Sequence, residues 1–491
     1  MKTRLLPCLF VLVLSAGAAL AGSYPIVDTG QDGCFDDTRQ IDCPKPGGPF
    51  DGQDAQYRGN VPRYRDNGDG TVSDLVTGLM WVKERGEPVT WREGMDGSAT
   101  CRMGGYADWR APTIKELYSL IDFNGWVQSD ERNSVPYIDT RYFGFKWGDT
   151  ASGRRIIDCQ DWSSTVYRGT TMGGNRTVFG VNFADGRIKG YPMQDPPGHG
   201  KSKYVRYVRG NSRYGLNDFL AHGPVVEDRA TGLVWQRADD GVTRNWEQAL
   251  AYCRDLDLGG RADWRLPSAK ELQSIVDYTR SPTATGSAAI DPVFAVTNPE
   301  SYFWTSTTHL DGPRPDHAVY LAFGRAMGWF SPPRSNRPKT LMDVHGAGAE
   351  RSDPKSGDPG RFPQGHGPQG DDIRILNYVR CVTGGGVVYY EPPNPPIPAW
   401  TGGLPGRRDP NMPSQMNGGP GVSRGMGRPQ GMEGQEGMNG PSGRRRPPSE
   451  AFTACQSKSQ GDGCTVQTPH GTLRGICRDL PDGTACVPQR R

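Results

Sequence analysis

Three aspartates in one glycine-rich stretch are the first residues whose types and spacing could support chemistry. The stretch reads DNGDGTVSD and contains Asp66, Asp69 and Asp74. Carboxylate oxygens are ligands that Ca²⁺ prefers, so these three residues could hold a calcium ion. An EF-hand is excluded, because the alignment that fits Gly70 places an arginine and a valine at the first and last ligand positions. The Asn-Gly and Asp-Gly pairs favour a simple hairpin turn, and a calcium site of another kind stays the alternative.

The cysteines indicate disulfides rather than a metal or redox site. Of eleven cysteines, Cys8 lies in an apolar N-terminal run, and the others form an even set without a C-x-x-C pair. In an exported chain this pattern is typical of disulfide bonds, and it predicts no free thiol. Cys34 and Cys43 are close enough in sequence to close a small loop. The last four are expected to pair among themselves, with the connectivity left open: Cys455, Cys464, Cys477 and Cys486.

The sequence lacks the residue patterns of several enzyme classes. No G-x-S-x-G nucleophile motif is present. The histidines of the second half show no spacing typical of a metal-binding triad: His222, His309, His317, His345 and His366. These observations favour a non-catalytic protein without a cofactor. A net charge of +3 also gives no bulk electrostatic case for binding nucleic acid.

Trp162 and Trp304 are the candidate ligand-binding residues, because each begins a run of hydroxyl side chains. The two runs read WSST and WTST. An indole ring beside hydroxyl groups can stack on a sugar, whereas burial at the end of a core strand is the more frequent role of tryptophan. Both interpretations are kept, and burial is the one we favour.

Two similar stretches organise the chain around these candidates. They are GGYADWRAPTIKELYSLID at 104–122 and GGRADWRLPSAKELQSIVD at 259–277. The proline disfavours helix before it, the S/T-x-x-E pattern after it is a capping box, and apolar residues then recur at helical spacing. Each stretch therefore predicts a loop followed by a helix. The arginines of the two ADWR motifs are expected to pair internally with the neighbouring Asp108 and Asp263 or with a backbone carbonyl.

Further repeated motifs predict two tandem domains, at 66–210 and 221–384. TGLMW is matched by TGLVW, and the closing KYVRYVRG by NYVRCV. A helix is expected after Asn245, whereas its counterpart after Thr90 carries two glycines that each weaken a helix by about 1 kcal/mol. VFGVNFADGRI and AVYLAFGRAMGW predict hairpins, and the Pro- and Gly-rich insertion at about 331–372 predicts a mobile loop.

The other segments are predicted to be a signal, a lead-in, a linker and a small module. Residues 1–21 combine basic residues, an apolar run and small residues, as secretory signals do, and predict export to the periplasm, cell surface or medium. The apolar run is short for a membrane anchor, and no later stretch is apolar enough to span a bilayer. Residues 22–65 form a polar lead-in, 385–450 a disordered Pro-, Gly- and Met-rich linker, and 451–491 a four-cysteine mini-module.

The order DNGDGTVSDLVTGLMW, ADWRAPTIKEL, WSST and a closing YVR strand resembles the Lcl C-terminal domain family, named from the Legionella collagen-like adhesin. The resemblance covers about residues 24–384, in two copies. Through NWEQALAYC, WRLPSAKEL and NYVRC, the second copy is also distantly similar to the formylglycine-generating-enzyme superfamily, which has a C-type-lectin-like fold. These resemblances imply an α+β protein with two tandem lectin-like domains, each with short helices on a small irregular antiparallel sheet.

The second resemblance also implies a disulfide between Cys253 and Cys381. In the first copy Tyr207 stands in the place of Cys381, which leaves Cys101 to pair with Cys159. Formylglycine-generating enzymes need a further pair of reactive cysteines, and the second copy has no cysteine between Cys253 and Cys381.

The adhesin resemblance therefore implies a non-catalytic exported protein that binds a polysaccharide or an envelope protein. A purely structural envelope protein is the first alternative, and an oxidoreductase like the formylglycine-generating enzymes is a more remote one. The sequence does not fix the ligand or the oligomeric state.

Overall fold

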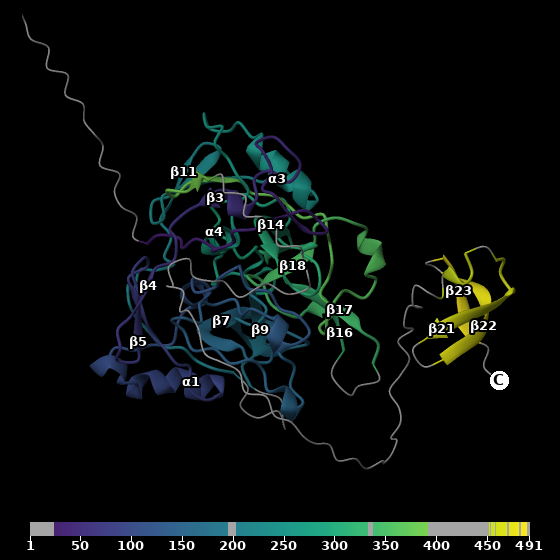
Figure 1. The fold of residues 1–491 in the computed structure, drawn as a ribbon. Coiled ribbons are helices and arrows are strands. Elements are labelled where there is room, and N and C mark those ends of the chain that lie inside the picture. Colours follow the sequence, from purple (N-terminus) through teal and green to yellow (C-terminus); the bar gives the residue numbers. More distant parts are fainter. Residues whose placement is uncertain are drawn as a thin grey trace, which may run out of the picture. The chain divides into compact units, whose positions relative to one another are not determined.

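The computed structural model describes residues 24–194, 203–331 and 337–390, and most of 451–488. Gaps in the last range are 452, 457, 469–470 and 481–482. The predicted signal peptide and most of the predicted linker lie outside these residues. The chain divides into two compact units, 1–407 and 408–491 (Figure 1). Among the described residues, no helix is long and apolar enough to cross a membrane.

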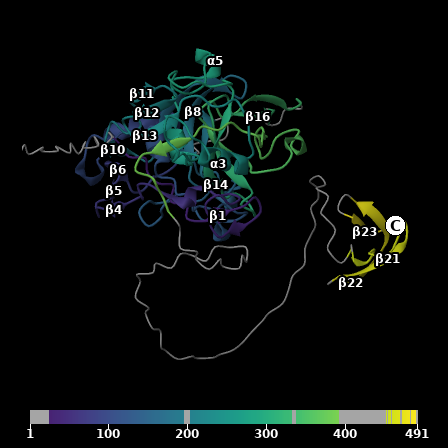
Figure 2. The same ribbon diagram turned by 90° about the horizontal axis from the view of Figure 1, so that it is seen from above.

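Each predicted domain contributes one four-stranded antiparallel sheet (Figure 2). The sheet of the first copy has the order β10-β6-β5-β4, from strands β4 Tyr64–Asp66, β5 Thr71–Asp74, β6 Leu79–Val82 and β10 Val208–Gly210. The second has the order β11-β12-β13-β19, from β11 Phe219–His222, β12 Val225–Asp228, β13 Leu233–Gln236 and β19 Val382–Gly384. Trp81 and Trp235 occupy matching register positions and are fully buried, so each sheet packs around one indole.

The helices are short and begin at side-chain caps. They are α1 Trp91–Gly97, α2 Ile114–Tyr118, α3 Trp246–Arg254, α4 Ala269–Ser274 and α5 Pro282–Thr285. Single 3₁₀ turns are η1 Asp54–Gln56, η2 Ser98–Thr100, η3 Met103–Gly105, η4 Glu131–Asn133, η5 Thr150–Ser152 and η6 Pro359–Arg361. The predicted capping boxes are confirmed: Thr113 and Ser268 accept the amide protons of Glu116 and Glu271, at 3.2 and 3.3 Å.

A six-stranded antiparallel sheet runs through both copies, in the order β14-β15-β18-β9-β8-β7 (Figure 1). The first copy supplies β7 Asp161–Thr171, β8 Asn175–Asn182 and β9 Arg187–Pro192, and the second supplies β14 Tyr302–His309, β15 His317–Ala322 and β18 Glu350–Pro354. The two halves meet where Glu350 pairs with Ile188. We call this junction the seam. Together with the short helices, these sheets place the protein in the α+β class.

The segment at 331–372 corrects the prediction of a mobile loop, because it contains β17 Thr340–Asp343 and the central strand β18. The expected hairpin after β15 is also wrong. Residues Met327–Phe330 form β16, which pairs with β17, while β15 pairs with β18. All five residues of β18 are buried, so packing outweighs the Pro- and Gly-rich composition around them.

Two lysines at the same motif position exchange contacts between the copies. Lys115 Nζ donates to the carbonyl oxygen of Ser274 at 2.6 Å, and Lys270 Nζ donates to that of Ser119 at 2.9 Å. Each ammonium group thus satisfies a carbonyl at the C-terminal end of the other copy's helix, where the helix dipole favours a cation. Burial lowers the pKa of both lysines to about 8.

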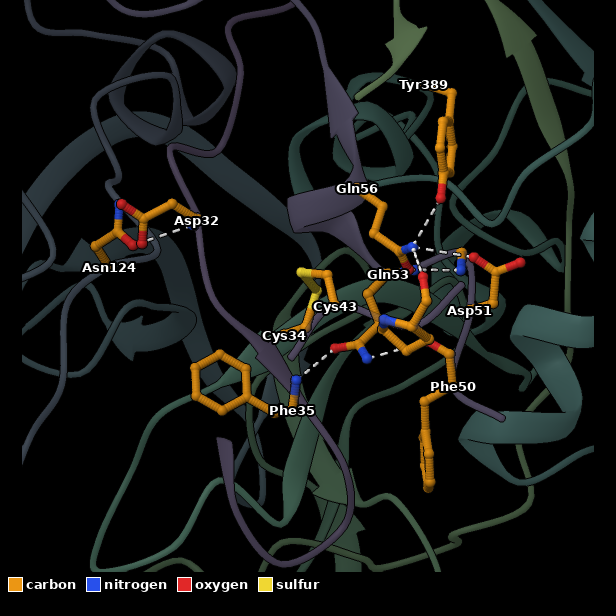
Figure 3. The surroundings of a disulfide bond; sticks show 12 residues. Asp32, Cys34, Phe35, Cys43, Phe50, Asp51, Gln53, Gln56, Asn124 and Tyr389 are labelled. Carbon is orange, nitrogen blue, oxygen red and sulfur yellow. Dashed lines mark hydrogen bonds between the residues drawn. A yellow bond between two sulfur atoms is a disulfide. The ribbon is translucent and has the colours of Figure 1, made fainter. Parts of the chain in front are cut away.

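The predicted lead-in is part of the folded unit. Its strands are β1 Cys34–Phe35, β2 Gln40–Ile41 and β3 Tyr57–Arg58, and β3 pairs with β20 Val388–Tyr389 near the end of the unit. Gln53 accepts the Phe35 amide proton at 2.8 Å, and the Cys34–Cys43 disulfide lies beside this contact (Figure 3). Gln31 donates to the carbonyl oxygens of Phe123 and Thr308, one in each copy, at 3.2 and 2.8 Å. The lead-in therefore connects the two copies through the hydrogen bonds of Gln31, a contact that we call the Gln31 strap.

The glycines of α1 have a packing role that helix propensity does not predict. Tyr207, which replaces Cys381 in the first copy, donates its hydroxyl proton to the Gly94 carbonyl at 3.0 Å. A Cβ atom at Gly97 would overlap the same hydroxyl oxygen. The ring and the glycine helix together take the place of the disulfide found in the second copy.

We therefore expect Gly97→Ala to destabilise the protein by about 1–3 kcal/mol, although alanine is normally the better helix former. Urea unfolding of the purified chain measures this. Tyr207→Phe removes the overlapping oxygen, so Gly97→Ala should cost much less in that background. An equal cost in both backgrounds would contradict the packing explanation.

The C-terminal unit is a three-stranded antiparallel sheet in the order β21-β22-β23. The strands are β21 Gly463–Thr468, β22 Gly471–Leu480 and β23 Gly483–Pro488. Disulfides Cys455–Cys477 and Cys464–Cys486 lie in its small core. The two disulfides compensate for a core that is too small to stabilise so short a segment alone.

Candidate functional site

Trp162 and Trp304 are core residues, which corrects their candidacy for ligand binding. Both are fully buried. Trp162 Nε1 donates to the carbonyl of Val89 at 3.1 Å, and Trp304 Nε1 donates to that of Arg244 at 2.8 Å. An indole with no exposed face cannot stack on a sugar, so these rings fix the start of β7 and β14.

The three aspartates of the first hairpin each make contacts close to them in the sequence or in the neighbouring strand. Asp66 pairs with Lys83 at 2.6 Å, Asp69 accepts from the Thr71 amide at 3.0 Å, and Asp74 accepts from the Val76 amide at 2.9 Å. The register of β4 and β5 sets Asp66 opposite Val72 and leaves Asp74 at the other end of the hairpin. The described residues do not bring these carboxylates together as a metal-ligand group, and the predicted hairpin is what they form.

The structure contains the expected disulfides Cys34–Cys43 and Cys253–Cys381. The expected Cys101–Cys159 bond is wrong, because both cysteines are free. An even count does not guarantee that two sulfurs can meet. In the C-terminal unit Cys455, Cys464 and Cys486 place their sulfurs within 4.8 Å of one another, but disulfides occupy all three, so they offer no thiolates to a metal.

Alkylation of the mature chain without reduction should therefore label two of the cysteines that the structure describes, Cys101 and Cys159, rather than none. We expect Cys101, which is partly exposed, to react in the native protein, and Cys159 to react only after unfolding, because burial raises its pKa to about 12. Peptide mass spectrometry identifies the labelled sites. An unlabelled Cys101 would contradict this assignment.

The ADWR arginines pair with the capping glutamates, which corrects the expected pairing with Asp108 and Asp263. Arg265 donates through both terminal nitrogens to Glu271, at 2.5 and 2.6 Å, and both side chains are 5% exposed. Arg110 pairs with Glu116 in the same way, but 34% of the Arg110 side chain is exposed. Each glutamate thus holds the helix cap and an arginine at once.

A small hollow, which we call the lead-in hollow, lies between the lead-in and the second copy. Its principal polar lining residues are Asp28, Asp54, Tyr57, Arg265, Ser268 and Glu271. Asp54 is 6% exposed and accepts a hydrogen bond from the Thr307 hydroxyl at 2.5 Å. Burial, reinforced by the charge of Asp28, raises the pKa of Asp54 to about 7. The hollow therefore presents a carboxyl group that changes charge near neutral pH.

Sequence reasoning missed this hollow. Asp54 lies in the DGQDAQY stretch of the lead-in, where nothing marks it as buried. Its partner Thr307 is far away in the sequence, in the hydroxyl run after Trp304. The one available signal was that run, whose hydroxyls serve buried polar contacts rather than a surface.

The first copy also carries an exposed aromatic–cation contact, the Tyr106–Arg209 stack. The Arg209 guanidinium carbon lies 3.8 Å from the centre of the Tyr106 ring, which is 36% exposed. Arg209 Nε donates to Asp108 at 2.7 Å, and the Trp109 ring lies in a T-shaped arrangement with the Tyr106 ring. The stack joins β10 to the loop that begins the ADWR motif, and each of its two side chains restricts the other.

The second copy has different residues at these positions. Arg261 takes the place of Tyr106, and Thr383 takes that of Arg209. Thr383 donates its hydroxyl proton to Asp263 at 2.7 Å, and Arg261 lies 3.8 Å from the same carboxylate. The stack is thus a feature that one copy adds to the shared scaffold.

Comparison with known proteins gives one family. The Lcl C-terminal domain matches at residues 70–209 and 224–337, in two copies. No curated protein and no solved structure matches this sequence. The two matched ranges contain both ADWR-motif helices, α2 and α4, and the strand pairs β5–β6 and β12–β13. With these ranges covering more than half of its length, the chain belongs to the Lcl C-terminal domain family.

Proposed function

We propose that this chain is an exported, non-catalytic binding protein that attaches to a polysaccharide or an envelope partner. Its family is associated with adhesin-like proteins, which supports a role in adhesion. We further propose that its two domains, at 66–210 and 221–384, are C-type-lectin-like, and that residues 1–21 direct export. The disulfides agree with an oxidising compartment.

The observation that carries this proposal is the Tyr106–Arg209 stack. An exposed tyrosine offers a flat apolar face, and the guanidinium offers hydrogen-bond donors to sulfate or carboxylate groups. The two side chains hold each other in one arrangement, so little side-chain entropy is lost on binding. Acidic or sulfated polysaccharides match this combination of ring face and positive charge.

We expect the mature chain to bind sulfated glycans weakly on a glycan array, and salt to reduce the binding. Tyr106→Ala and Arg209→Ala should each weaken binding by about five- to tenfold, which corresponds to about 1 kcal/mol. Arg261→Ala in the second copy is the matched control and should bind as the unmodified chain does. Absence of any glycan signal at every ionic strength would leave the structural alternative.

That structural alternative has one observation in its favour. The six-stranded sheet, the exchanged lysines and the Gln31 strap fuse the two copies into one unit. Such a body suits a spacer or an anchor as well as it suits a binding head. A glycan array separates the two functions. A spacer would bind no glycan, so Tyr106→Ala would change nothing on the array.

A further inference from the structure

We propose that the lead-in hollow binds the side-chain ammonium group of a lysine presented by a partner protein. This inference is independent of the proposed polysaccharide site, which lies on the first copy. It assigns the hollow a ligand of a different charge.

The size of the hollow selects a terminal group. Its cavity volume is about 20 Å³, whereas one water molecule needs about 10–15 Å³ on the same measure and pockets for whole small molecules span about 300–1,000 Å³. A sugar ring or the planar guanidinium group of arginine is too large. An ammonium group is close to water in size and fits.

The charge of the lining favours a cation. Both oxygens of Glu271 accept from Arg265, so these two side chains neutralise each other. The carboxylates of Asp28 and Asp54 remain as negative charges on the wall. Asp28 is held by the amide protons of Gly30 and Gly59, both at 2.8 Å, which fixes its position.

The ionisable groups whose charge interacts with Asp54 come from the lead-in and from both copies. Burial raises its pKa most, and the charges of Asp28 and Glu271 raise it further, whereas hydrogen bonds from Thr307 and Thr29 lower it. The other ionisable groups whose charge interacts with Asp54 are Tyr118, Arg265 and Lys270. The Lys270 ammonium is already engaged by the carbonyls of Asp28 and Ser119 at 2.9 Å. An incoming cation would therefore find its main charge partner in ionised Asp54.

The remaining lining of the hollow is apolar and aromatic. Ile26, Val27 and Val387 line the hollow together with the ring of Tyr57. Tyr389, which is 45% exposed, packs edge-on against Tyr57 with the ring centres 5.6 Å apart. A lysine can lay its four methylene groups along such a surface while its charge contacts the carboxylate. A polar amino sugar has no equivalent stem.

The test uses the full-length protein and three probes: Nα-acetyl-lysine methylamide, its norleucine analogue and glucosamine. Calorimetry at pH 6 and pH 8 measures affinity. Binding of the lysine probe should tighten by about tenfold from pH 6 to pH 8, because the ionised fraction of a group with a pKa near 7 rises by about that factor. Equal binding of the norleucine analogue, equal binding of glucosamine, or no lysine binding at millimolar concentration would overturn the proposal.

Two variants locate the site. Asp54→Asn should weaken binding and abolish its pH dependence. Val387→Phe should fill the hollow with a larger lining side chain while leaving Asp54 unchanged, so it keeps the test valid if Asp54→Asn folds poorly. Asp343→Asn is the matched control, since Asp343 is another buried aspartate whose pKa is raised, to about 6, and it lies in β17 and does not line the hollow. Unchanged lysine binding in Val387→Phe, or loss in Asp343→Asn, would place the ligand elsewhere.

Discussion

Replacing Arg265 with methionine should destabilise the first unit by about 3–5 kcal/mol. The guanidinium and the Glu271 carboxylate form a two-pronged pair in which both side chains are 5% exposed. Removing one partner leaves the other as an uncompensated buried charge, which is the costly case for a buried ion pair. Glu271 would retain only local donors such as the Ser268 amide, at 2.9 Å.

The first copy supplies the control for this experiment. Arg110→Met breaks the same motif contact, but the 34% exposure of the Arg110 side chain lets water replace the guanidinium. We expect a smaller loss, about 1–2 kcal/mol, because the guanidinium is partly solvated although the Glu116 side chain is only 2% exposed. Guanidinium chloride unfolding, followed by fluorescence, compares the two variants. Equal losses would show that burial does not set the strength of this pair.

A second control separates charge from size. Glu271→Gln in the Arg265→Met background removes the stranded carboxylate and keeps the capping geometry. It should recover part of the lost stability, because the buried charge is gone. No recovery would mean that lost packing of the arginine stem, rather than the unpaired charge, caused the destabilisation.

Local patterns in the sequence predicted local structure well. The capping boxes at Thr113 and Ser268 formed as expected, because their donors and acceptors lie within one helical turn. The hairpin of β4 and β5 followed from its Asn-Gly and Asp-Gly pairs for the same reason. The arginine partners were missed, although Glu271 is visible six residues after Arg265. Choosing among several nearby acids needs the three-dimensional path of the chain.

Long-range structure was harder to predict. The strand β18 lies in a stretch whose proline and glycine content indicated a loop, and only its burial between β15 and β9 shows its role. The lead-in hollow depends on Asp54 meeting Thr307. Cys101 and Cys159 show the reverse error, since an even cysteine count suggested a bond that the fold does not make. In each case the outcome depends on whether two residues far apart in the sequence meet in the fold, and no sequence spacing indicates this.

The seam between the copies concentrates buried charge and gives the pH dependence of stability its clearest test. Glu350 is fully buried where β18 meets β9 and accepts the Ile188 amide proton at 3.2 Å through one oxygen. Its other oxygen has no hydrogen-bond partner among the described residues. Burial raises the pKa of Glu350 to about 8, against the opposing effect of Arg187 and Arg351.

The sign of the effect follows from proton counting. Between the ordinary pKa of glutamate and pH 8, the folded protein keeps a proton on Glu350 that the unfolded chain has released. Stability contributed by this group therefore falls as pH rises through that window and is lowest above pH 8. Other buried acids, including Asp54 and Asp353, also titrate in this range, so a single profile cannot isolate Glu350.

Comparison of the unmodified protein with Glu350→Gln isolates the contribution of Glu350 to the pH dependence of stability. Glutamine keeps the shape and the acceptor for Ile188 but cannot ionise, so the variant should match the unmodified protein near pH 5 and exceed its stability by on the order of a few kcal/mol at pH 8. Urea unfolding at several pH values measures the difference. Glu300→Gln, in a pair with Arg325 that is about one-third exposed, is the control and should show no such growth with pH. Parallel profiles for the Glu350 variant and the unmodified protein would mean that the two arginines keep this carboxylate charged, and that the seam is held by ion pairs instead of a neutral acid.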